Sequence, residues 1–354
     1  MTALPESPRL APEPAVHTAR VRVFVPTHRR PVLLERALRS LLRQTVTNWI
    51  CEVHNDAPGD SSPAQLVARL GDSRILNVEH ERNLGARASF NLFYRPIAEP
   101  FMALLEDDAH WEPRFLETLL ETLERHPTAT MAWCNQAIDE ETETGEVRQT
   151  GRRVNPERGQ AERLFHWGES WVQVMGALHA NGAMVLRVRP GVAYPTPDLP
   201  FGGVEAFRER LLPHPLVYVE QTLATFTVTR RTARSDEAGD WGALCALLAR
   251  SYLRHATLPP EAMASLWRHY ATQRPPATAP LMAAALGCRE ARPLLRLASV
   301  GEWLHFLLSA LRHPVATCRL LRAAARFPDA ASALDRATQQ RFEERRAAVP
   351  TPPR

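Results

Sequence analysis

The 354-residue chain has a hydrophobic content of 45% and a charged content of 23%, which predict a soluble globular protein. All 43 basic residues counted as Lys and Arg are arginines, which excludes Schiff-base chemistry and a P-loop lysine, and the net charge of +4 is too small to indicate nucleic-acid binding. The five cysteines are widely spaced without a C-x-x-C pair, which favours reduced thiols in the cytoplasm over a zinc site, and no apolar run approaches the roughly 20 residues of a membrane-spanning helix.

Strands alternate with helices over the first 135 residues of the predicted structure. We expect strands at 21–26, 49–54, 74–79, 101–105 and 128–135, and helices at about 31–42, 62–70, 85–94 and 113–125. This alternation predicts an α/β fold with a mostly parallel, doubly wound sheet. The polar segment 136–165 is expected to form a surface excursion or hairpin, and the chain becomes helical from about residue 240.

Polar residues follow three of the predicted strands, at residues 27–29, 55–56 and 106–108. In a doubly wound sheet the ligand site lies beyond the carboxyl ends of the strands. We therefore expect the three groups to open onto the same edge of the sheet.

The acidic triplet Glu106-Asp107-Asp108 ends an apolar strand and has two interpretations. Asp108 is a suitable N-cap for the helix that follows. Carboxylates are also hard oxygen donors that bind Mg²⁺ or Mn²⁺, often together with substrate phosphates. The position of the triplet on the predicted ligand edge favours metal binding.

Asp56 and the segment "HERNLG" are further candidates. Asp56 is either a turn residue or a carboxylate that accepts N–H groups from a nucleotide base or ribose. The stretch Asn83-Leu84-Gly85 could cap a helix, and Arg82 could be a solvated charge. Alternatively the loop closes on a nucleotide, with the arginine stacking on the base or pairing with phosphate.

The combination of these motifs resembles the family 2 glycosyltransferases, over roughly residues 21–235. The segments that carry the resemblance are "VRVFVPTHRRPVLLERALRSLLRQTVTNWICEVHNDAP", "ERNLGARASFN", "LLEDD" and "EPRFLETLL". The resemblance implies an inverting enzyme with the GT-A (Rossmann-like) fold and helices on both faces of the sheet. It also implies a nucleotide-diphosphate sugar donor and a divalent metal, Mg²⁺ or Mn²⁺.

The family motifs assign roles to individual residues of this chain. In the family, a Pro-Thr strand end and an aspartate such as Asp56 hold the nucleoside, and Asp107 would lie near the ribose. Asp108 would carry the metal, with Glu106 in place of the first Asp of the family's D-x-D motif. The expected nucleotide-sugar site comprises Pro26, Thr27, Arg29, Asp56, Arg82, Asn83 and Asp107.

The second half of the domain matches the family more loosely. Glu205 stands five residues before Arg210-Leu211, the position of the family's catalytic base, although it could also be a solvated helix residue. Thr229 replaces a metal-binding His of many relatives, and the segment 180–188 resembles a glycine-rich strand on the acceptor side. The Q-x-x-R-W signature of processive members is missing, which favours transfer of a single sugar.

Acceptor and membrane contacts are predicted from aromatic and basic residues. Trp167 and Trp171 either stack on an acceptor sugar or belong to the core. Residues 289–326 contain seven Arg and two Glu around "EWLHFLLSAL", and form either a core helix or an interfacial helix. An interfacial helix would rest on an anionic membrane and reach a lipid-linked acceptor.

The resemblance therefore implies a hexosyltransferase-type glycosyltransferase that acts in bacterial surface polysaccharide or glycoconjugate synthesis. Its acceptor would be a glycan or a lipid-linked molecule, and its location cytoplasmic or peripheral on the inner face of the membrane. The alternatives are a catalytically impaired nucleotide-sugar-binding or scaffold protein and a nucleotidyltransferase. The expected domains are a GT-A domain at 21–235 and a helical region at 240–340, with flexible tails at 1–20 and 341–354.

Overall fold

The computed structural model describes residues 19–194, 196, 204–229 and 241–348, which form two compact units. The first unit contains the described residues up to Leu164, together with His179–Ala193 and the segment that starts at Leu216. The second contains Phe165–Leu178, the described residues of Tyr194–Pro215, and the C-terminal helices. The units therefore differ from the predicted division near residue 240, because two segments from within 21–235 pack with the C-terminal helices.

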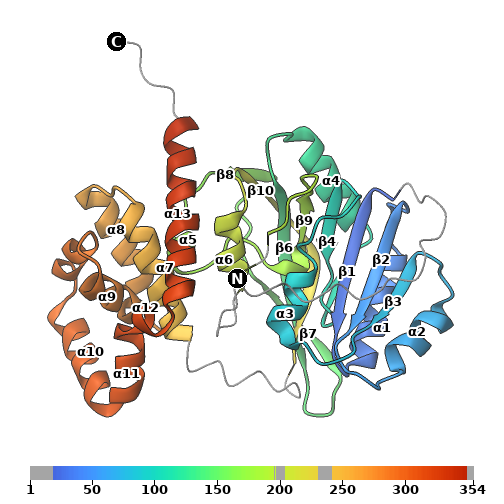
Figure 1. Cartoon of the computed structure of the whole chain (residues 1–354), viewed down its shortest axis with the longest axis horizontal. Helices are drawn as coiled ribbons and strands as arrows, with labels where there is room; N and C mark the ends of the chain where they lie inside the picture. Colours follow the sequence, from blue (N-terminus) through green and yellow to red (C-terminus); the bar gives the residue numbers. More distant parts are fainter. Residues whose placement is uncertain (1–18, 195, 197–203, 230–240, 349–354) are drawn as a thin grey trace, which may run out of the picture. The chain divides into compact units, whose positions relative to one another are not determined.

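A ten-stranded sheet runs through the described part of the first unit (Figure 1). Eight strands follow the order β3-β2-β1-β4-β9-β6-β10-β5, while β7 pairs with β6 and β8 pairs with β10. The strands are β1 (Val21–Thr27), β2 (Trp49–Asn55), β3 (Ile75–Glu79), β4 (Phe101–Leu104), β5 (Ala109–Trp111), β6 (Met131–Glu141), β7 (Val147–Arg153), β8 (Glu162–Phe165), β9 (Met184–Arg187) and β10 (Leu216–Val228).

The sheet is mixed, and its parallel part contains the strands that were predicted first. The neighbours β3-β2-β1-β4 are all parallel, as are β6 and β10. Strand β9 runs antiparallel to both β4 and β6, and β5 is antiparallel to β10. Strands β6 and β7 form the antiparallel hairpin expected within 136–165. The α/β class and all five predicted strands are confirmed.

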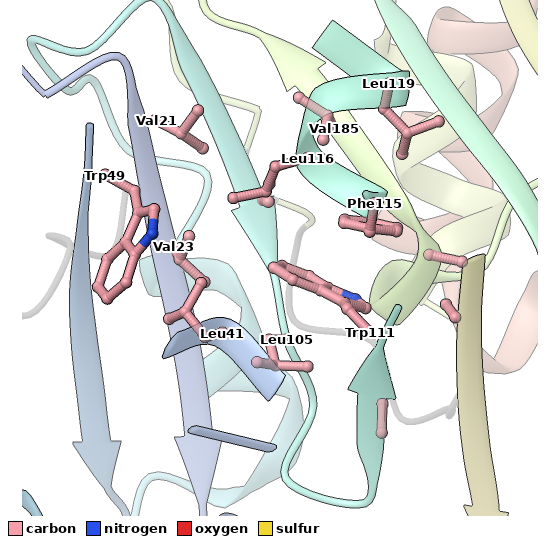
Figure 2. Close-up of a cluster of buried hydrophobic side chains, with 14 of the residues drawn as sticks. Val21, Val23, Leu41, Trp49, Leu105, Trp111, Phe115, Leu116, Leu119 and Val185 are labelled. Atoms are coloured by element: carbon pink, nitrogen blue, oxygen red, sulfur yellow. The ribbon is translucent and has the colours of Figure 1, made fainter. Parts of the chain in front are cut away.

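Helices cover both faces of this sheet, which confirms the doubly wound arrangement. Among the described residues of the first unit, the α-helices are α1 (Pro31–Leu42), α2 (Ser62–Leu70), α3 (Gly85–Leu92) and α4 (Phe115–Arg125). Leucines of α1, α2 and α4 pack with Val21 and Val23 of β1 in one buried cluster, part of which is drawn in Figure 2. Because side chains alternate along a strand, Phe24 faces the other side and stacks on Phe93, directly after α3.

The described part of the second unit is helical. Its helices are α5 (Val172–Met175), α6 (Val204–Leu211), α7 (Trp241–His255), α8 (Pro260–Ala271), α9 (Thr278–Gly287), η3 (Arg292–Arg296), α10 (Val300–Arg312), α11 (Pro314–Leu321), α12 (Ala323–Arg326) and α13 (Pro328–Ala348). Trp167, Tyr252 and Phe342 belong to its buried core. Within the ranges that the structure describes, no helix has both the length and the apolar character needed to cross a membrane.

Candidate functional site

The carboxyl ends of β1, β2 and β4 meet at one edge of the sheet. The backbone N–H of Asp56 donates to the carbonyl oxygen of Thr27 at 3.0 Å, so the residues that end β1 and follow β2 are in contact. The Thr27 hydroxyl donates to Oδ2 of Asp107 at 3.0 Å. Thr27 therefore connects Asp56 with the acidic triplet, and the predicted convergence of the three polar groups is confirmed.

Two carboxylates of the triplet share one arginine. Nη1 of Arg30, in the loop between β1 and α1, donates to Oδ1 of Asp107 at 2.8 Å and to Oδ2 of Asp108 at 3.1 Å. Burial raises the pKa of Asp107 to about 6 even though Arg30 and Thr27 favour its ionised form. Burial also raises the pKa of Asp108 against the influence of Arg30. One guanidinium therefore leaves this acidic pair incompletely neutralised, and the pair favours an additional cation.

A second arginine ties the triplet to β10. Nη2 of Arg36 donates to the carbonyl oxygen of Asp108 at 2.9 Å and to Oγ1 of Thr227 at 2.6 Å. Arg30 and Arg36 were not predicted as site residues. Arg30 belongs to the basic cluster that follows the first strand, whereas Arg36 lies within α1 and has no comparable signal in the sequence.

Glu106 contacts the segment that precedes β9. Its Oε2 accepts the backbone N–H of Gly182 at 3.1 Å, and Gly182 lies in the short helix η1 (Asn181–Ala183). A Cβ atom at position 182 would lie 2.9 Å from this oxygen, so a side chain there would displace the carboxylate. The segment 180–188 thus lies beside the acidic triplet, while the metal-binding role of Glu106 stays a prediction.

Asp56 anchors the loop that leads into α3. Its carboxylate accepts the backbone N–H of Leu84 at 2.7 Å and that of Gly85 at 3.0 Å, and it bonds to Nδ1 of His80 at 3.1 Å. Nδ2 of Asn83 donates to the carbonyl oxygen of Asp56 at 2.9 Å. Burial raises the pKa of Asp56, but these hydrogen bonds outweigh that effect and lower it, so the carboxylate is ionised at neutral pH.

The remaining residues of the predicted nucleotide-sugar site lie on the same loops. Arg29 has a positive φ of 56°, a conformation that strains a residue with a side chain, and it is exposed two residues after Thr27. Pro26 is half-buried, and Arg82 is exposed beside Asn83. Contact of these side chains with a nucleotide sugar stays a prediction.

The predicted acceptor residues belong to the second unit. Trp167 is 1% exposed and packs against Tyr252 and Phe342, so the prediction that it stacks on an acceptor sugar is wrong, and its core interpretation holds. Trp171 is half-buried and donates from Nε1 to Oγ of Ser265 at 3.2 Å. Its stacking role stays a prediction.

Glu205 lies in the first turn of α6, also in the second unit, and is half-buried. Its role as catalytic base toward the acidic triplet of the first unit stays a prediction. Thr229, which was expected at the position of the family's metal-binding His, directly follows β10 and is half-buried.

The chemistry of the triplet is compatible with a divalent cation held partly by substrate. Among the described residues, no group of three or more His, Cys, Asp and Glu side chains is arranged to hold a metal ion. Mg²⁺ is commonly bound by only one or two carboxylates together with substrate phosphates. Asp107 and Asp108 supply adjacent carboxylates, and the side chain of Asp108 is 27% exposed. These residues therefore fit an ion that arrives with a diphosphate.

Comparisons with known proteins agree with the fold and the motifs. Residues 22–177 match the sequence model of Glycosyl transferase family 2. WcaA of Escherichia coli, assigned as a glycosyl transferase of colanic acid biosynthesis, is 26% identical over 149 residues, which cover 41% of this chain and 52% of WcaA. The chain thus spans about half the length of this curated relative.

Solved structures resemble the chain over most of its length. The crystal structure of S. aureus TarS has a TM-score of 0.53 at 12% identity, with 93% of this chain and 92% of TarS covered. TarS in complex with UDP-GlcNAc has a TM-score of 0.52 at 13% identity, with the same coverage. At these identities the likeness establishes the fold alone. The sequence match makes residues 22–177 similar to the family 2 glycosyltransferases, and the solved structures show that the chain shares the fold of TarS.

Proposed function

We propose that the chain is an inverting, metal-dependent enzyme that transfers a single sugar from a nucleotide-diphosphate sugar to an acceptor hydroxyl. The observation that carries this proposal is the pair of bonds through which Thr27 links Asp56 to Asp107 at the sheet edge. UDP-GlcNAc bound to TarS and the assignment of WcaA to colanic acid biosynthesis support a nucleotide-sugar donor and a role in surface polysaccharide or glycoconjugate synthesis.

The donor would be held by the loops at this edge. Asp56 would accept N–H groups of the nucleoside, Asp107 would bind the ribose, and Arg29 and Arg82 are exposed cations available to the diphosphate. Asp108, with Glu106 beside it, would hold Mg²⁺ or Mn²⁺, which when bound neutralises the diphosphate as a leaving group.

Glu205 would act as the general base. Its carboxylate would take the proton of the acceptor hydroxyl, whose oxygen forms the new bond to the anomeric carbon. The bond from that carbon to the diphosphate oxygen breaks on the opposite face, so the configuration inverts and the nucleoside diphosphate leaves with the bonding electrons. General-base assistance of this kind contributes about 10²–10⁴-fold to the rate.

The test is incubation of the protein with Mn²⁺ and a panel of UDP-, GDP- and dTDP-sugars, with release of the nucleoside diphosphate as the readout. We expect slow donor hydrolysis with one class of donor. Asp108→Ala should abolish metal-dependent donor binding in calorimetry, and unchanged binding would refute its role as a ligand. Binding without any hydrolysis or transfer would support the non-catalytic alternative, and release of pyrophosphate from a nucleoside triphosphate would support a nucleotidyltransferase.

The base is tested separately with Glu205→Gln. Glu261 is a suitable control, because it also lies in the first turn of a helix of the second unit. Transfer should fall by at least about 100-fold in Glu205→Gln and stay unchanged in Glu261→Gln. Near-normal transfer by Glu205→Gln would show that another group removes the proton.

A peripheral membrane contact through α10 and α11 is a second part of the proposal. Of α10, only Phe306 is buried, and Phe306 and Trp303 pack in the core of the second unit, so one side of the helix faces the core and the rest is exposed. Large apolar side chains are exposed on α10 and at the start of α11, with exposed fractions from 40% to 85%. They are Val300, Leu304, Leu307, Leu308, Leu311 and Val315. Exposed arginines at 292, 296, 312, 319 and 322 lie in the same segment and suit an anionic lipid surface.

This contact is tested by sedimentation with vesicles of phosphatidylcholine, with and without phosphatidylglycerol. The wild type should bind only the anionic vesicles, and the double variant Leu304→Glu with Leu311→Glu should not bind. Val147→Glu, which alters an exposed apolar residue of the first unit, is the control. If the double variant instead converts a dimer to a monomer, the surface is covered by a second copy and the membrane contact is refuted.

A further inference from the structure

A chain of buried side chains runs beneath the candidate donor site, from Glu52 on β2 to Asp56. Oε2 of Glu52 lies 3.0 Å from Nε2 of His54, Nδ1 of His54 lies 3.1 Å from Nε2 of His80, and Nδ1 of His80 lies 3.1 Å from Oδ1 of Asp56. All four residues are at most 6% exposed. Two imidazoles therefore stand in series between two carboxylates, away from solvent.

The three contacts between these four side chains need three protons. Each is a contact between two atoms that can both accept a hydrogen bond, so each requires one N–H or O–H between them. Two neutral imidazoles carry only two ring protons. With both carboxylates ionised, one imidazole must be an imidazolium for all three contacts to be hydrogen bonds.

The position of the extra proton follows from the surroundings of the two rings. Burial lowers the pKa of His54, against the opposing influence of Glu52, so His54 is the neutral member. Its Nε2–H then donates to Glu52 and its Nδ1 accepts. An imidazolium at His80 completes the chain, since it donates from Nε2 to His54 and from Nδ1 to the ionised Asp56.

The charges of the surrounding elements agree with one imidazolium. Glu52 also pairs with Arg22 of β1 and with Arg95, and Arg22 pairs with Glu99. Three buried carboxylates, those of Glu52, Glu99 and Asp56, thus face two guanidiniums, and a single imidazolium balances the charge. The carboxylate of Glu79, next to His80, is exposed and is bonded instead by the side-chain amides of Asn55 and Asn77.

We infer that His80 is a positioning residue of the donor site, held as an imidazolium that fixes the carboxylate of Asp56 and, through it, the loop at Leu84 and Gly85. This inference rests on the proposed function, since the loop is the one that would close on the donor nucleotide. Loss of the proton from His80 would leave two lone pairs facing each other, either toward His54 or toward Asp56. Where the opposed lone pairs are those of His80 and Asp56, the Asp56 carboxylate loses one of its three side-chain contacts and the loop loosens.

The protonation of the two buried histidines can be measured without any nucleotide. In the full-length protein labelled with ¹⁵N-histidine, we expect His80 at about pH 7 to show two protonated ring nitrogens, and His54 to be neutral with its proton on Nε2. The spectra of His80→Gln and His54→Gln assign the signals. The backbone amide signals of Leu84 and Gly85 should shift as His80 titrates. A neutral His80 at this pH, or amide signals that do not respond to its titration, would overturn the inference.

The link to donor binding is measured with UDP and GDP by calorimetry in constant Mg²⁺, from about pH 6 to about pH 9. Nucleotide affinity of the wild type should fall about tenfold as His80 loses its proton, which corresponds to the loss of one charge-assisted hydrogen bond. His80→Gln should bind weakly at every pH, whereas the control His126→Gln, which removes a histidine bonded to Glu162 at 2.8 Å, should follow the wild type. Circular dichroism and melting temperature establish that the variants are folded.

The two proposals fail in different ways. If neither nucleotide binds at any pH, the proposed function fails, and the ¹⁵N spectra and amide shifts still decide the state of His80. If nucleotide binds but its affinity does not change across the titration of His80, the positioning role is refuted while the donor site stands.

Discussion

The buried carboxyl of Asp107 is expected to reduce stability when it is ionised. Burial raises its pKa from the ordinary value of 3.8 to about 6, with a further contribution from the neighbouring Asp108. A raised pKa makes the ionised form about 3 kcal/mol less favourable in the fold than in the unfolded chain. This cost is absent below the ordinary pKa, grows as the pH rises toward the folded value, and is complete above about pH 6.

Asp107→Asn removes this charge with little change in shape. The amide oxygen can still accept from Arg30, and the amide nitrogen can donate to Thr27, because a hydroxyl can reverse its role. We therefore expect the variant to gain stability relative to the wild type by about 2 kcal/mol between about pH 4.5 and about pH 8. Its relative melting temperature should rise by roughly 4–8 °C over this interval. Donor binding should be weakened in the same variant.

The assay is thermal unfolding of both proteins in EDTA across this pH interval. Asp72→Asn is the control with the opposite sign, because the hydrogen bond of Arg74 lowers the pKa of Asp72, so that its substitution should destabilise the fold above the ordinary pKa. The reasoning is refuted if Asp107→Asn melts below the wild type at about pH 8, or if the difference between the two proteins does not depend on pH.

Three further predictions concern the same site and the second unit. Arg30→Gln removes the guanidinium that competes with a cation for the carboxylates of Asp107 and Asp108. Calorimetry should therefore find that the variant binds Mn²⁺ about tenfold more tightly than the wild type. Equal Mn²⁺ affinity of the two proteins would contradict this competition. Gly85 and Gly71 have φ of 75° and 66°, so Gly85→Ala and the control Gly71→Ala should each lower stability by about 1–2 kcal/mol. Only Gly85→Ala should also weaken nucleotide binding. An equal effect of both variants on binding would refute the role of the loop. Trp167→Ala should cost about 3–5 kcal/mol as a core truncation and leave donor hydrolysis unchanged at low temperature, whereas unaltered melting with a raised KM for acceptor would restore its stacking role.

Much of the first unit could be predicted from local patterns. The strands at 21–26 and 101–105 are short apolar runs, and polar residues follow them directly. Once these strands are parallel neighbours, their carboxyl ends must lie at one edge, because parallel strands joined by helices share a direction. The meeting of Thr27, Asp56 and Asp107 therefore follows from the order of the elements rather than from any single contact.

Strands β5 and β7 to β10 were harder to predict individually. Strand β5 has only three residues, and β9 only four, so neither carries a recognisable period. Their places in the sheet depend on pairing with partners that are distant in the sequence, such as β9 with β4. Such pairings are decided by the packing of the whole unit.

The sequence by itself determined the class of fold and the edge on which the polar residues collect, since both depend on the spacing of apolar residues and on the direction of the strands. Only the tertiary structure decided which side chains neutralise, orient and bury one another there. Arg36 bonds to Thr227 across 191 positions, and His54 reaches His80 across 26, while Trp167 is enclosed by helices far along the chain. The physical reason is that a side chain adopts the conformation that its three-dimensional neighbours allow, and these neighbours come from segments whose local patterns are independent of one another.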